Sequence, residues 1–100
     1  MELRSAQIAP SVQHDLEQAM TILKEGGCSA VFLFGSAAKG TMHAQSDLDL
    51  AVRGCPPQRY FYLLGRLLAD LEHAVDLVDL DIPSPFVDFL LTKGNLVQLD

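Results

Sequence analysis

The chain has 100 residues, a hydrophobic fraction of 49% and a net charge of −6. This length fits one small domain, residues 1–100, and the apolar content is high enough to form a core, which excludes wholesale disorder. Both halves are acidic, with three basic and six acidic side chains in residues 1–50 and four and seven in residues 51–100. The chain therefore lacks the basic surface with which proteins bind a nucleic-acid backbone.

The residue pattern predicts both helices and strands. Pro10 is typical of a helix start, and the Gly26-Gly27 pair ends the amphipathic pattern that follows it. Short apolar runs rich in β-formers predict strands. The expected elements are a helix at 10–25, strands at 30–34 and 47–52, a helix at 58–71, a strand at 74–80, a helix at 86–92 and a short strand at 96–99. We expect the buried face of the second helix to consist of Phe61, Leu64, Leu68 and Leu71. This order predicts an α/β (α+β) fold, a small mixed β-sheet with helices packed on one face.

Two carboxylates begin the second expected strand. Asp47 and Asp49 are two residues apart, so their side chains lie on one face of the strand, while Leu48 and Leu50 point to the other face. Neighbouring carboxylates repel each other, and a divalent cation between them converts the repulsion into attraction. Mg²⁺ prefers such hard oxygen ligands. For an isolated Asp-x-Asp pattern, the alternative is an acidic edge strand that faces solvent.

Two further features favour the metal site. Gly35 and Ser36 follow a buried strand, where glycine permits close approach to a ligand and the serine hydroxyl and following amides can donate hydrogen bonds to phosphate. The third expected strand carries Asp76 in its apolar interior, where an unpaired charge is costly. Asp76 can therefore complete a three-carboxylate site. Asp79, three residues further on, is expected to face the other side and to be solvated.

This combination resembles the nucleotidyltransferase motif of the DNA polymerase β superfamily. The resemblance lies in Gly35-Ser36, ten intervening residues and Asp47-Leu48-Asp49. The short length and the later segment Val75-Asp76-Leu77-Val78 are similar to the minimal nucleotidyltransferases, or MNT proteins, which include the MntA-like antitoxins. The resemblance covers residues 11–99 and implies the polymerase β-like fold. It also implies ATP or another nucleoside triphosphate, two Mg²⁺ ions with Mn²⁺ as an alternative, and transfer of a nucleoside monophosphate to an acceptor.

The resemblance also implies individual roles. Asp47 and Asp49 match the paired metal ligands, and Asp76 matches the third acid, which in the family helps to bind the catalytic metal and activates the acceptor hydroxyl. The nucleotide-binding residues that it implies are Gly35, Ser36 and Lys39. Family members often read Gly-Ser-Arg-Ala-Arg-Gly at this turn, whereas this chain reads Gly-Ser-Ala-Ala-Lys-Gly at 35–40. One cation is therefore missing, and the other is a lysine, which lacks the bidentate fork of arginine.

The implied biological role is that of an antitoxin in a HEPN/MNT toxin–antitoxin pair. In such pairs the MNT protein can transfer AMP to a tyrosine of a helical HEPN ribonuclease. The alternative is a non-catalytic module of the same fold that neutralises or scaffolds a partner. We expect exposed apolar surface to be covered by that partner or by another copy of the chain, as in a homo-oligomer. The expected contact residues are Tyr60, Tyr62, Phe86 and Phe89.

Outside the motif the sequence carries no further catalytic signal. Cys28 and Cys55 form no Cys-x-x-Cys pair, so we expect two buried, reduced thiols. His14 and His73 lie on or beside amphipathic helices and are expected at the surface. Residues 1–9 lack the apolar core of a signal peptide, and no apolar run approaches the ~20 residues of a membrane span. We therefore expect a cytoplasmic protein that binds no membrane.

Overall fold

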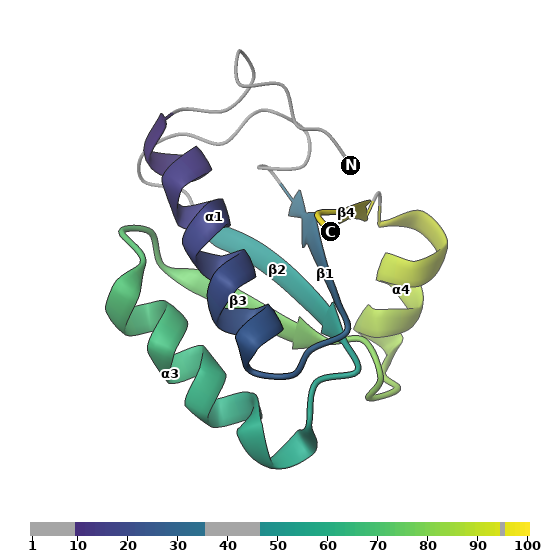
Figure 1. Cartoon of the computed structure of the whole chain (residues 1–100). Coiled ribbons are helices and arrows are strands. Elements are labelled where there is room, and N and C mark those ends of the chain that lie inside the picture. Colours follow the sequence, from purple (N-terminus) through teal and green to yellow (C-terminus); the bar gives the residue numbers. More distant parts are fainter. Residues whose placement is uncertain (1–9, 36–46, 95) are drawn as a thin grey trace.

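A computed structural model describes residues 10–35, 47–94 and 96–100 of the chain (Figure 1). Its elements are α1 (Pro10–Glu25), β1 (Ala30–Phe34), β2 (Leu48–Arg53), the short 3₁₀ helix η2 (Pro57–Arg59), α3 (Tyr60–Asp70), β3 (Val75–Asp79), α4 (Pro85–Lys93) and β4 (Val97–Gln98). The predicted order of helices and strands is confirmed. None of the helices in the described part of the chain has the length and apolarity needed to cross a membrane.

The four strands form one mixed sheet in the order β3-β2-β1-β4. β1 is antiparallel to both β2 and β4, whereas β2 and β3 are parallel and are joined by a crossover through α3. The ends of the parallel ladder are closed by hydrogen bonds from the Leu48 amide to the Ala74 carbonyl at 2.7 Å and from the Leu80 amide to the Val52 carbonyl at 2.9 Å. The small mixed sheet of the predicted fold class is confirmed.

The two faces of the sheet bury different helices. Alternate strand residues such as Leu33 and Leu50 belong to the main core, which also contains the buried residues of α1 and α3. On the opposite face, Phe34 and Ala51 form a second apolar cluster to which α4 contributes two buried side chains. The two longer helices therefore share one face, as expected, whereas α4 covers part of the other face, because alternation leaves apolar strand residues there too.

The buried face of α3 differs from the prediction. Leu63 and Leu67 are buried against the sheet, whereas Phe61 and Leu68 are 81% and 53% exposed. The prediction was wrong for these two residues, although the other two expected residues do contact the main core. The segment YFYLLGRLLADL is apolar around most of its circumference, so periodicity alone did not identify the inward face. Packing against β3 and α1 selects it.

A buried carboxylate on α1 holds the segment that leads into β3. Asp15 Oδ1 accepts a hydrogen bond from the Glu72 amide at 3.0 Å, and Oδ2 accepts one from the His73 amide at 2.9 Å. The same Oδ2 lies 2.7 Å from His73 Nδ1. Burial raises the pKa of Asp15, but the hydrogen bonds from Glu72 and His73 outweigh it, so the pKa lies below its usual value. The predicted surface position of His73 was wrong, because Asp15 satisfies its ring and amide in the core.

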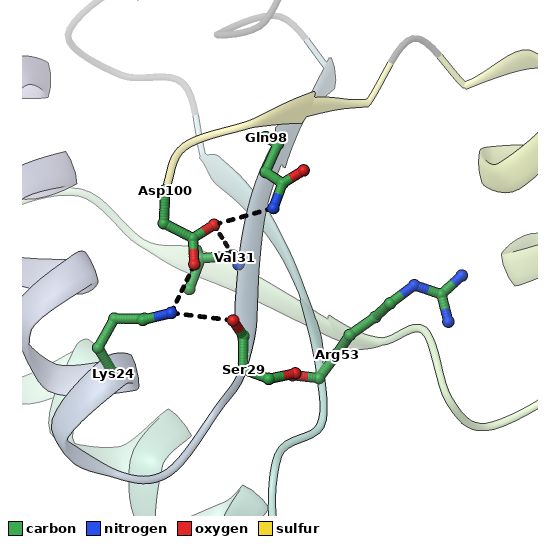
Figure 2. Close-up of polar contacts among 6 residues, drawn as sticks. All are labelled: Lys24, Ser29, Val31, Arg53, Gln98 and Asp100. Carbon is green, nitrogen blue, oxygen red and sulfur yellow. Dashed lines mark hydrogen bonds and ion pairs between the residues drawn. The ribbon is translucent and has the colours of Figure 1, made fainter. Parts of the chain in front are cut away.

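A second polar cluster ties the last residues to α1 and β1 (Figure 2). The Asp100 carboxylate lies 2.6 Å from Lys24 Nζ and accepts a hydrogen bond from the Val31 amide at 3.2 Å. Lys24 Nζ also donates to the Ser29 carbonyl at 2.9 Å. The hydrogen bond from Lys24 is the main reason that the pKa of Asp100 is lowered. These contacts fasten the β4 edge of the sheet to the end of α1.

Both cysteines are free and buried, as expected. They lie just beyond one end of the β1–β2 ladder. Ala30 pairs with Arg53 there, and the same register continued by two residues places Cys28 opposite Cys55. Burial and the neighbouring Cys55 thiol raise the pKa of Cys28 to about 12. Its thiolate is therefore scarce at neutral pH, and Cys28 is a packing residue.

The first testable prediction concerns Asp15. Replacing it with alanine leaves the Glu72 and His73 amides and a buried imidazole without their acceptor, so Asp15→Ala should lower the free energy of unfolding by about 3 kcal/mol at pH 7. The folded-state pKa is depressed, so the stabilisation exists above the unfolded pKa of about 3.9 and is lost as the pH falls through the folded pKa. The gap between wild type and variant should therefore shrink in acid.

Urea unfolding from pH 7 down to pH 3 measures this gap. Glu17→Ala is the matched control, because Glu17 lies on the same helix and is exposed. An Asp15→Ala loss no larger than that of Glu17→Ala, or one that does not depend on pH, would contradict the assignment.

Candidate functional site

The sheet register places two of the three predicted carboxylates side by side. Asp49 of β2 is the ladder partner of Asp76 on the parallel neighbour β3, and it lies opposite Phe34 on β1. Ladder partners project to the same face of a sheet. Asp49 and Asp76 therefore lie on the face that α4 covers in part, away from the main core. Asp49 is half-buried, and Asp76 is exposed.

The third predicted carboxylate, Asp47, lies near Asp49. Asp47 lies immediately before β2 and is exposed. Burial, the negative charges of Asp76 and Asp47, and a side-chain hydrogen bond with Asp76 raise the pKa of Asp49. Asp47 and Asp76 are thus close enough to Asp49 to disfavour its ionised form. A cation at this place would relieve that repulsion.

The carboxylates fit a divalent metal ion by their chemistry. Carboxylate oxygens are the hard ligands that Mg²⁺ prefers, and Mg²⁺ commonly uses only one or two of them, with water and phosphate oxygens completing its shell. Within residues 10–35, 47–94 and 96–100, no group of three or more histidine, cysteine or acidic residues stands at metal-binding spacing. The fit therefore rests on the Asp49–Asp76 pair and on the neighbouring charge of Asp47.

Gly35 makes room for this pair. It directly follows β1 and has a φ of +71°, a left-handed conformation that favours glycine. A Cβ built at Gly35 would collide with the carboxylate of Asp49. The Asp49 carboxylate is thus a reason for glycine at this position that the sequence did not reveal. The close approach of a ligand, which the sequence predicted, stays a prediction. Ser36 and Lys39, the other predicted nucleotide-binding residues, lie outside the described residues, and their roles stay predictions.

Asp79 lies away from the pair. It is the ladder partner of Val52, a main-core residue, so it faces the opposite side of the sheet from Asp76. Its Oδ1 accepts a hydrogen bond from the Asp81 amide at 2.9 Å, which closes the turn after β3. Asp79 is partly buried rather than fully solvated.

A hollow of about 200 Å³ opens beside Asp49. The sheet contributes Phe34, Gly35 and Asp49 to its lining. Its other wall is one side of α4, with Phe86, Phe89, Leu90, Lys93 and Gly94. Sequence reasoning had treated the two phenylalanines as partner contacts and gave Lys93 no role. The sequence does place Phe86, Phe89 and Lys93 at helical spacing, which was the available signal. Only the packing of α4 on this face of the sheet shows that the three side chains lie beside Asp49.

The comparison with protein families finds one match. The model described as polymerase beta, nucleotidyltransferase, matches residues 17–98. No protein of curated function matches the chain by sequence.

Solved structures share the fold. A chain of a toxin–antitoxin crystal structure with AMP-PNP is 28% identical, with a TM-score of 0.67 over 82% of this chain and 69% of that one. A chain described as a minimal nucleotidyltransferase is 26% identical, with a TM-score of 0.66 over 84% of this chain and 90% of that one. A third comes from a tri-AMPylated HEPN toxin of Shewanella oneidensis in complex with its MNT antitoxin, with 23% identity and a TM-score of 0.63 over 86% of this chain and 69% of that one. At that identity the third likeness shows the fold alone.

A second prediction follows from the raised pKa of Asp49. Because its ionised form is disfavoured in the fold, the contribution of Asp49 to stability is fully present below the unfolded pKa and is lost as the pH rises through the folded pKa. Without divalent metal, Asp49→Asn should therefore be more stable than wild type at pH 7. The difference should fade below about pH 4.

Thermal unfolding in EDTA at both pH values measures this effect. Glu17→Gln, which removes an exposed carboxylate from α1, is the control and should not change the melting temperature. Destabilisation by Asp49→Asn at pH 7 would show that the repulsion is not the dominant force on Asp49.

A third prediction concerns Gly35. Alanine there must adopt a left-handed backbone and displace the Asp49 carboxylate, so Gly35→Ala should destabilise the fold by about 1–3 kcal/mol. In an Asp49→Ala background the collision disappears, and only the strain of the left-handed backbone still lowers the free energy of unfolding. A double-mutant cycle by urea unfolding should therefore show a smaller cost in that background. Equal costs in the two backgrounds would rule out the contact between Gly35 and Asp49.

Proposed function

Because this chain belongs to the polymerase β nucleotidyltransferase family, we propose that it is a Mg²⁺-dependent nucleotidyltransferase that transfers AMP from ATP to an acceptor hydroxyl. The pairing of Asp49 with Asp76 beside Gly35 carries the proposal. A fold without this chemistry has no need to hold two carboxylates together at a cost in stability. AMP-PNP in the structure of a 28%-identical neighbour supports a nucleotide as the ligand.

Asp47, Asp49 and Asp76 would hold the metal. In reactions of this class, two divalent ions stabilise the charge on the attacking and leaving oxygens of an in-line displacement. Asp49 and Asp76, which are ladder partners, would hold metal together with the neighbouring Asp47. Mn²⁺ has the same preference for oxygen ligands and is expected to replace Mg²⁺.

Asp76 has a second role in this proposal. It is the exposed member of the pair, so an acceptor can reach it. Its carboxylate takes the proton of the acceptor hydroxyl as the bond from the acceptor oxygen to the α-phosphorus forms. The bond from that phosphorus to the bridging oxygen breaks, and pyrophosphate leaves. Ser36, Lys39 and the amides of their turn are proposed to bind the triphosphate.

The proposed acceptor is a hydroxyl on a HEPN-type partner protein, toward which this chain would act as the antitoxin. A neighbour that shares 28% identity comes from a toxin–antitoxin structure, which supports a partner of this kind. A second hollow of about 420 Å³, lined mainly by apolar side chains of η2, α3, β3 and the β3–α4 turn, offers a surface for the partner. Phe61 and Ile82 line it and are 81% and 61% exposed. Exposed apolar side chains around a hollow are typical of protein interfaces.

Not all aromatic side chains of α3 are available to a partner. The Tyr60 hydroxyl donates a hydrogen bond to the Leu77 carbonyl on β3, so this ring is part of the fold. Tyr62 is 57% exposed and lies under the Arg59 guanidinium, 5.3 Å from the ring centroid. We therefore retain Tyr62 as a contact residue and assign Tyr60 to the edge of the sheet, where it blocks further strand pairing.

The alternative function is a non-catalytic module of the same fold that binds and neutralises or scaffolds the partner. The turn at 35–40 favours it, since the turn contains one lysine and no arginine. The two functions differ in one property only, because both require the complex and only the enzyme requires transfer.

The fourth prediction separates them. Incubation of the protein with its genomic neighbour, labelled ATP and Mg²⁺ should place label on the neighbour. Asp76→Asn should reduce the rate by a hundredfold or more, because it removes both a metal ligand and the general base. Asp70→Asn is the matched control, since Asp70 is an exposed carboxylate at the end of α3 that lines neither hollow, and it should transfer label at the wild-type rate.

Co-purification is measured in parallel. Asp76→Asn should still form the complex, because Asp76 is proposed to act on the acceptor and not at the contact surface. A wild-type complex that transfers no label from any nucleoside triphosphate would reject the enzyme in favour of the binding module. Absence of both complex and label would reject the two together.

A further inference from the structure

We propose that one side of α4 forms the nucleoside-binding wall of the site, with Phe86 and Phe89 stacking against the base and Lys93 pairing with the phosphates. This inference rests on the proposed function and deepens it, because it assigns ligand contacts to residues outside the carboxylate and turn motifs. Four observations on the described residues carry it.

The first observation is the position and size of the hollow. It joins Asp49 on one side to α4 on the other. Its volume of about 200 Å³ is below the roughly 300–1,000 Å³ of pockets that enclose a whole drug-sized ligand. It can therefore accept one part of a nucleotide while the rest extends along the sheet. The apolar walls of the hollow suit the nucleoside part of a nucleotide. From there the phosphates of the same molecule can reach the carboxylates, because Asp49 lies at the edge of the hollow.

The second observation is the exposure of the two phenylalanines. Phe86 is 50% exposed and Phe89 is 53% exposed. The side of α4 that packs against the core consists of Val87 and Leu90, which are buried. Val87 and Leu90 thus anchor the helix, and about half of each aromatic side chain remains accessible to a ligand. Half-exposed aromatic rings that line a hollow suit a planar ligand, and stacking of this kind tolerates any base.

The third observation is that the aromatic wall is held in place. The Phe86 ring meets Phe34 edge to face, with 6.0 Å between the centroids and an angle of 65°. Phe34 is buried and is the ladder partner of Asp49. The orientation of Phe86 is therefore coupled to β1, whose last residue is Phe34. A pre-positioned ring loses little entropy when a ligand stacks on it.

The fourth observation is charge. Asp49 repels an anionic ligand, and the chain carries a net charge of −6. Among the described residues that line the hollow, Lys93 is the one cation. It follows Phe86 and Phe89 along the same helix, seven and four residues later, so the three side chains lie on one stripe of α4. Within the described ranges, no carboxylate pairs with Lys93. Its ammonium is available for phosphate.

The test compares two ligands, ATP and inorganic tripolyphosphate, each titrated by calorimetry in the presence of Mg²⁺. Phe89→Ala should weaken ATP binding by about tenfold and leave tripolyphosphate unchanged, because only ATP carries a base. Phe89→Leu should resemble Phe89→Ala, since it keeps an apolar side chain without a ring, and Phe89→Tyr should bind ATP as wild type does. Lys93→Gln should weaken both ligands by several-fold.

The chain offers matched controls. Leu91→Ala changes a side chain of α4 that is 46% exposed and does not line the hollow. Arg66→Gln removes a cation of α3 that does not line the hollow. Both variants should bind ATP and tripolyphosphate with wild-type affinity. Melting temperatures of all variants confirm that each is folded in the titration.

The outcomes separate this inference from the proposed function. If wild type binds ATP and Asp49→Asn does not, but Phe89→Ala and Lys93→Gln bind normally, α4 is not the nucleoside wall and the proposed function stands. Equal weakening of ATP and tripolyphosphate by Phe89→Ala would likewise overturn the stacking role. If wild type binds neither ligand with Mg²⁺ or Mn²⁺, the inference and the nucleotidyltransferase proposal fail together.

Discussion

The parallel register of β2 and β3 is the constraint on which the site depends. It pairs Asp49 with Asp76, and a shift by one residue would turn every side chain of β3 to the opposite face. Asp15 holds the start of β3 through the Glu72 and His73 amides, immediately before the Leu48–Ala74 hydrogen bond that opens the ladder. A buried carboxylate on α1, outside the site, thus helps to determine which carboxylates meet in it.

The site itself works against the stability of the fold. Asp49 is partly buried beside two other negative charges, and Gly35 adopts a left-handed backbone where another residue would be strained. The main core offsets these costs, because α1 and α3 bury leucine, isoleucine and valine side chains against one complete face of the sheet. Local conflict supported by a well-packed remainder is typical of functional sites.

The two faces of the sheet divide these tasks. The face under α1 and α3 carries the main core, whereas the face toward α4 carries Asp49, Asp76 and a smaller apolar cluster. Because α4 has only nine residues, it covers part of this second face and leaves a hollow beside the carboxylates. The helix that completes the fold on this side is therefore also the wall nearest to the proposed chemistry.

Local patterns in the sequence determined the order of elements, the two-residue spacing of Asp47 and Asp49, and the choice of Asp76 over Asp79. The first two depend on backbone periodicity, and the choice of Asp76 rests on its position among apolar residues inside the strand, so all three are properties of neighbouring residues. The inward face of α3, the burial of His73 and the approach of α4 to Asp49 were decided only by the tertiary structure. An almost uniformly apolar helix has no preferred side until a sheet packs against it, and a histidine is buried only when a distant carboxylate such as Asp15 satisfies it. These are contacts between segments far apart in the chain, and no local pattern encodes which segments will meet.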